Sequence, residues 1–108
     1  MIDHLSDATF KREVLLSEEP MLVTFMATEC DPWKAMSWAL EQVARELQGR
    51  VKVVKLDVNQ NPGLRAMYEI HGLPTLILFS QGVPVARRVG AVAQSEDLES
   101  WINASIDI

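Results

Sequence analysis

Two short apolar segments with a helical pattern between them are the feature that most limits what this chain can fold into. Residues 21–27 are mostly apolar, do not alternate with polar residues and follow a proline, which predicts a buried central strand. Asp31-Pro32 is a typical helix start, and apolar residues then share one face up to Leu47. Residues 51–57 are rich in β-branched side chains and predict a second strand. A strand, a helix and a second strand in succession favour an α/β protein.

The remaining segments continue this alternation. A helix is predicted to begin at Ser6-Asp7, another at Asn61-Pro62 and a last one at Ser95, because these residue types occupy the first positions of helices. The predicted order is α β α β α β β α, and we expect a central mixed sheet flanked by helices on both faces. The last two strands are predicted over residues 75–79 and 83–89, as a hairpin around the turn Gln81-Gly82.

The composition favours one soluble domain over residues 1–108. The net charge of −5 argues against electrostatic binding of nucleic acid or of an anionic membrane. The N-terminus shows no signal-peptide pattern and no apolar run approaches the about 20 residues that span a bilayer, so we expect a cytoplasmic location. We also expect a monomer. Cys30 is the only cysteine, which excludes an internal disulfide and a cysteine-ligated zinc site, and we expect no metal or other cofactor.

Several segments resemble the thioredoxin family in order and spacing. They run Val54-Lys-Leu-Asp-Val-Asn-Gln-Asn-Pro-Gly63, Tyr68-Glu-Ile-His-Gly-Leu-Pro-Thr-Leu-Ile-Leu-Phe79 and Gln81-Gly-Val-Pro-Val-Ala86, followed by Val89-Gly-Ala91. The resemblance covers essentially the whole chain and implies the thioredoxin fold. In that family the proline of the G-I-P-T segment is cis and faces the active-site cysteines, and Pro74 holds that position here.

The active-site loop departs from the family pattern. Family members read W-C-G-P-C-K, whereas this chain reads Glu29-Cys30-Asp31-Pro32-Trp33-Lys34. The first cysteine, the proline and the lysine match, but Trp33 replaces the second, resolving cysteine. We expect Trp33 at the rim of the substrate groove, where it would close the groove or anchor a partner.

Two further features of the family are absent. The buried aspartate that assists proton transfer in thioredoxins falls on Thr24, and the proline that kinks their active-site helix falls on Trp38. An aromatic side chain in the first turns of a helix is more often packed than exposed, so we expect Trp38 in the core or against the sheet.

Cys30 is the candidate nucleophile, but one sulfur cannot complete dithiol reduction. A first thiolate forms a mixed disulfide with the substrate, and a second thiol then releases the product. Because Trp33 carries no nucleophile, the mixed disulfide would persist until an external thiol removed it. A helix N-terminus stabilises a thiolate, whereas Glu29 and Asp31 oppose one by charge repulsion, so a functional monothiol and a weakly reactive leftover thiol both remain open.

The resemblance also implies a groove that binds extended peptides beside the cis-proline. The residues expected to line it, besides the loop, are Met26, Leu73, Pro74, Gly90 and Ala91. We therefore expect a redox-atypical protein that binds a peptide or protein partner through this groove. A monothiol oxidoreductase that forms mixed disulfides through Cys30 is the alternative, and a general dithiol reductase is the least favoured function.

Overall fold

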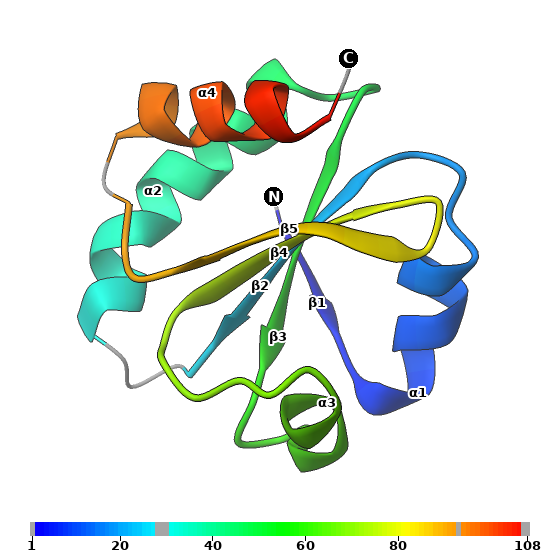
Figure 1. Cartoon of the computed structure of the whole chain (residues 1–108). Coiled ribbons are helices and arrows are strands. Elements are labelled where there is room, and N and C mark those ends of the chain that lie inside the picture. Colours follow the sequence, from blue (N-terminus) through cyan, green and yellow to red (C-terminus); the bar gives the residue numbers. More distant parts are fainter. Residues whose placement is uncertain (1, 28–30, 93, 107–108) are drawn as a thin grey trace.

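A five-stranded mixed sheet forms the centre of the molecule (Figure 1). The computed structural model describes residues 2–27, 31–92 and 94–106, and for residues 31–35 it describes the backbone alone. The strand order is β1-β3-β2-β4-β5; the first three strands in this order run parallel, and β4 and β5 are each antiparallel to their neighbours. The strands are β1 (Asp3–Leu5), β2 (Met21–Met26), β3 (Lys52–Asp57), β4 (Thr75–Ser80) and β5 (Val83–Val89). The predicted mixed sheet and its terminal hairpin are confirmed.

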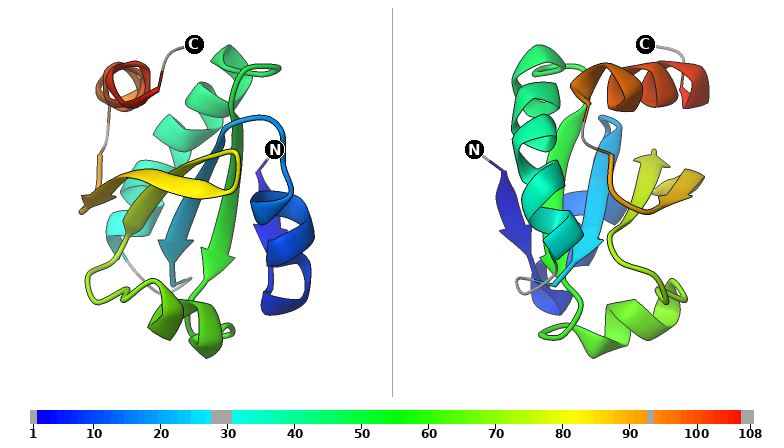
Figure 2. Two further views of the ribbon diagram at one scale, coloured as in Figure 1. Left: turned by 45° about the vertical axis from the view of Figure 1, so that its right-hand side comes forward. Right: turned by 90° about the vertical axis from the view of Figure 1, so that its left-hand side faces the viewer.

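Helices cover both faces of the sheet, as the alternation of elements predicts (Figure 2). Side chains of a strand point alternately to its two faces, and β2 buries both sets. On one face Leu22 packs in a cluster with α2 and α4, and on the other Val23 packs in a second cluster with α1, η1 and α3. The helices are α1 (Asp7–Phe10), continued by a π-helical turn η1 (Lys11–Leu15), α2 (Asp31–Glu46), α3 (Pro62–Met67) and α4 (Ser95–Ser105).

The first strand, β1, corrects the predicted order to β α β α β α β β α. It pairs parallel to β3, with Asp3 opposite Val54 and Leu5 opposite Leu56. β1 has three residues, of which only Leu5 is buried. A segment this short does not show the alternation of apolar and polar residues that identifies a strand in sequence. The segment is a strand because it pairs with β3, which is distant in sequence.

Trp38 lies on the outer face of α2, and the prediction that it packs in the core is wrong. Its side chain is 65% exposed, whereas Met36 and Leu40 are fully buried. Residues three and seven positions further along a helix share a face, and for Trp38 these are Glu41 and Arg45. The position of Trp38 on the polar face of α2 therefore determines its exposure, despite the general preference of tryptophan for burial.

Candidate functional site

The cysteine loop lies largely outside what the structure describes. Glu29 and Cys30 are outside the described residues, as are the side chains of Asp31, Pro32, Trp33 and Lys34. The backbone of α2 is described from Asp31 onward, so the helix predicted directly after the cysteine is confirmed. The roles assigned to the loop side chains remain predictions.

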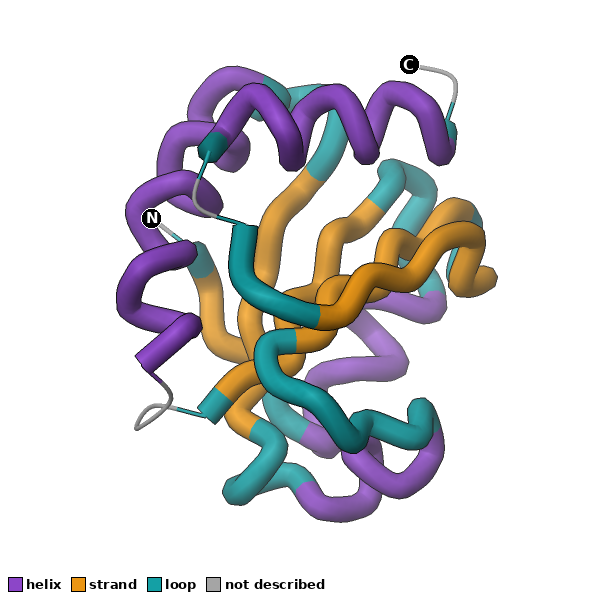
Figure 3. Tube along the Cα trace, turned by 60° about the vertical axis from the view of Figure 1, so that its left-hand side comes forward, coloured by secondary structure: helices purple, strands orange, loops and turns teal. Residues whose placement is uncertain are grey.

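Pro74 lies beside the end of β2 from which the chain leads to this loop. The peptide bond between Leu73 and Pro74 is cis. Thr75, the first residue of β4, is opposite Phe25 near the end of β2. The amide of Gly90, just after β5, donates a hydrogen bond of 2.9 Å to the carbonyl oxygen of Pro74. Figure 3 shows the loop before β4 next to the segment that follows β5.

The described residues expected to line the groove differ in how far they are exposed. Pro74 is buried, Leu73 and Gly90 are half-buried, and Ala91 is exposed. Met26 is only 1% exposed and packs in the core cluster beneath α2. This burial corrects the expectation that its side chain lines a groove: even-numbered residues of β2 face α2, and Met26 belongs to that set.

The loop before Pro74 is fixed by close contacts that the sequence analysis did not identify. The Thr75 hydroxyl donates a 2.6 Å hydrogen bond to the carbonyl oxygen of Gly72. A Cβ atom added to Gly72 would come within 2.7 Å of Cγ1 of Val89, so a larger residue at this position would require the Val89 side chain to shift. These contacts set the direction in which Leu73 and Pro74 are presented.

Thr24 lies in the middle of β2, where the family resemblance would place a buried acid. Its side chain is 0% exposed, and Oγ1 has no hydrogen-bond partner within the described part of the chain. Its neighbours across the sheet are Lys55 on β3 and Leu76 on β4. A threonine hydroxyl does not act as a proton acceptor near neutral pH, so this position supplies no buried carboxylate for proton transfer.

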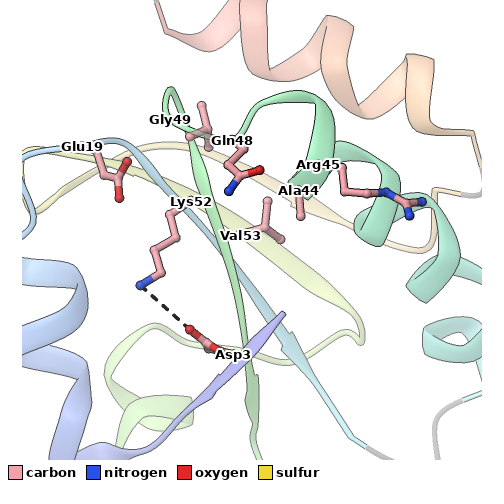
Figure 4. Close-up of a pocket in the computed structure, with 9 residues that line it drawn as sticks. Asp3, Glu19, Ala44, Arg45, Gln48, Gly49, Lys52 and Val53 are labelled. Atoms are coloured by element: carbon pink, nitrogen blue, oxygen red, sulfur yellow. Dashed lines mark ion pairs between the residues drawn. The ribbon is translucent and has the colours of Figure 1, made fainter. Parts of the chain in front are cut away.

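A hollow lies away from Pro74, at the other end of the sheet (Figure 4). It has a volume of about 340 Å³ and is lined by Asp3, Glu19, Ala44, Arg45, Gln48, Gly49, Val51, Lys52 and Val53. Lys52 is opposite Met21 at the start of β2, whereas Pro74 lies beyond the strand's other end. The Lys52 ammonium is 4.0 Å from Asp3 Oδ2 and 3.9 Å from Glu13 Oε2. This charged hollow is separate from the candidate site.

Two further kinds of feature were sought among the described residues. None of the helices there is both long and apolar enough to cross a bilayer. Nor do three or more histidine, cysteine, aspartate or glutamate side chains of that part of the chain converge in a way that would hold a metal ion.

Comparisons with known proteins match this chain along nearly its whole length. The family model described as Thioredoxin matches residues 1–104. A thioredoxin of Rickettsia felis is 38% identical over 98% of this chain and 100% of its own length. A thioredoxin of Pseudomonas aeruginosa is 38% identical over 97% of this chain and 96% of its own, and one of Porphyra purpurea is 38% identical over 97% of both.

Proposed function

The chain belongs to the thioredoxin family, and from that premise we propose that it binds a peptide or protein partner beside Pro74 without completing dithiol reduction. The names of its relatives suggest a redox role for the family's fold. The observation that carries the narrower proposal is a single cysteine in the whole chain, combined with an intact segment around Pro74. The cis bond before Pro74 is present, while the second cysteine is absent.

Dithiol turnover needs two sulfur nucleophiles, and this chain has one cysteine. When the Cys30 thiolate attacks a substrate disulfide, a mixed disulfide forms and one substrate thiolate leaves. Release of the second substrate sulfur needs another thiolate, and position 33 carries an indole instead. Thr24 also provides no buried carboxylate to take up a proton. The chain therefore stops after the first exchange.

Support for partner binding comes from the geometry next to Pro74. The hydrogen bond from Gly90 to Pro74 holds two backbone segments side by side, with Leu73 half-buried and Ala91 exposed at their edge. An extended peptide can add main-chain hydrogen bonds to such an edge, each contributing about 1 kcal/mol. We propose one bound segment per monomer, in the cytoplasm.

A second candidate function is monothiol exchange. The backbone of α2 begins at Asp31, next in sequence to Cys30, and the N-terminus of a helix favours a thiolate. In this function a partner bound through Cys30 is released by a small thiol, which takes over the mixed disulfide.

Retention of partners by tagged protein separates these functions. Wild type and Cys30→Ser are expected to retain the same proteins. Ala91→Glu, which places a charge at the exposed edge, is expected to weaken retention by about tenfold or more, whereas Ala104→Glu, an equal change at an exposed position of α4, is expected to have no effect.

Two results of this measurement would count against the proposal. Loss of all partners with Cys30→Ser would favour monothiol exchange. Equal retention by the Ala91→Glu and Ala104→Glu proteins would show that partners bind elsewhere.

A further inference from the structure

Arg87 connects β5 to the loop that leads to Pro74. Its Nη1 donates a hydrogen bond of 2.6 Å to the carbonyl oxygen of Tyr68, and its Nη2 donates one of 2.6 Å to the carbonyl oxygen of Glu69. Two parallel donors of one planar guanidinium thus bind two successive carbonyls. Such paired geometry fixes direction as well as distance, which a lysine ammonium cannot do.

The same strand contacts the loop at two more points. Val89, two residues after Arg87 and therefore on the same face of β5, lies close to Gly72, where an added Cβ atom would come within 2.7 Å of its Cγ1. Gly90 then donates its amide to Pro74. The loop therefore contacts β5 or the residue after it at its start, near its middle and at its end.

The start of the loop is held from the core side as well. The Tyr68 ring lies 5.6 Å from the Phe10 ring, 5.9 Å from Phe25 and 5.6 Å from Phe79, and burial raises the pKa of its hydroxyl. Glu69 has a φ of +52°, a conformation that residues with a side chain disfavour. Arg87 holds the carbonyls on either side of this unfavourable step, so it fixes the direction in which the loop leaves α3.

We infer that Arg87 is a positioning residue for partner binding, which orients Leu73 and Pro74 through the loop that it holds. This inference rests on the proposed binding of an extended segment beside Pro74. Arg87 itself need not touch the partner. Substitution of Arg87 would leave Pro74 unchanged but would orient it less well toward the backbone of a bound segment.

The test compares two activated disulfides, one with flanking residues on both sides of its cysteine and one without. One is an octapeptide of alanine and threonine with a central cysteine, and the other is N-acetylcysteine amide; each carries nitrothiobenzoate on sulfur. The Cys30 thiolate attacks the cysteine sulfur, a Cys30–cysteine disulfide forms, the coloured nitrothiobenzoate leaves with the electron pair, and the thiol proton passes to solvent. The rate constant for the octapeptide is divided by that for N-acetylcysteine amide. The same quotient is measured with free glutathione as the attacking thiol, which corrects for the intrinsic reactivity of the two disulfides. The first quotient divided by the second measures recognition of the flanking residues.

The wild-type ratio is expected to be about ten, the value of one or two added main-chain hydrogen bonds. Arg87→Gln is expected to lower it about fivefold, and Arg87→Lys, which keeps one donor and the charge, to lower it less. Arg88→Gln, the same change on the opposite face of β5, is the matched control and is expected to keep the wild-type ratio.

A measurement without the thiol accompanies this one. Amide hydrogen exchange at residues 69–73 is expected to accelerate in the Arg87→Gln protein and not in Arg88→Gln. If exchange there is unchanged, or if the Arg87→Gln ratio equals a high wild-type ratio, Arg87 does not position the loop and the inference is wrong. A wild-type ratio near one would instead contradict the proposed groove, and the inference with it.

Discussion

Thr24 buries a hydroxyl group for which the described structure offers no partner. Burying an unsatisfied hydroxyl costs about 1–3 kcal/mol, and valine has nearly the same shape without the polar atom. Thr24→Val is therefore expected to raise the free energy of unfolding by about 1 kcal/mol, as measured by urea denaturation.

Thr75 provides the matched control for this prediction. It is equally buried, but its hydroxyl donates to Gly72, so Thr75→Val leaves a carbonyl without its donor and is expected to destabilise the protein by about 1 kcal/mol or more. If both substitutions destabilise the protein to the same extent, the Thr24 hydroxyl is satisfied and the account of this position is wrong.

The contact between α2 and α4 contains two neighbouring carboxyl groups. The pKa of Glu99 is raised, first by a hydrogen bond with the Glu46 side chain, then by burial and by the Glu46 charge, while Arg50 partly opposes the shift. Folded protein then binds more protons than unfolded protein, so stability falls as pH rises from the unfolded pKa through the raised one. Glu99→Gln is expected to flatten this fall and to stabilise the protein above it by less than about 1 kcal/mol, since the site is largely exposed.

Thermal unfolding followed from pH 4 to pH 7 tests this expectation, with Glu96→Gln as the control on the same helix. Glu96 contributes the smallest of the named effects on Glu99. A steeper loss of stability with pH in the Glu99→Gln protein than in wild type would contradict the assigned direction.

Most elements were predictable because their signals are local. The apolar run of β2, the face of α2 around Leu40 and the turn at Gly82 each lie within one short segment, and each appears in the structure. β1 was missed because its pairing with β3 is a contact distant in sequence. Trp38 was placed wrongly because its preference for burial was weighed without its helix face.

The candidate site was predictable in part for the same reason. The segments Tyr68–Phe79 and Val89–Ala91 predicted that Leu73, Pro74 and Gly90 lie together, and the structure joins Gly90 to Pro74 through a hydrogen bond. The role of Arg87 had no sequence signal, because its partners Tyr68 and Glu69 are reached only through the arrangement of β5 against the loop. The burial of Met26 could be predicted only by knowing which alternate residues of β2 face α2.

The molecule as a whole combines a thioredoxin scaffold with a single cysteine. The segment after its edge strand β5 is hydrogen-bonded to Pro74, and in the proposed function recognition depends on this backbone and not on the cysteine. Catalytic turnover depends on a second thiol, which the chain lacks. The proposed function therefore predicts that binding and reduction are separable in this protein.

Counting disulfides reduced per protein molecule tests this separation most directly. The purified wild-type monomer is incubated with insulin, NADPH and a thioredoxin reductase, without any small thiol, beside a Trp33→Cys variant in which the second sulfur is restored. Wild type is expected to open no more than about one disulfide per molecule and then to stop as a mixed disulfide, whereas Trp33→Cys continues. Reduction of many disulfides by each wild-type molecule would contradict the account.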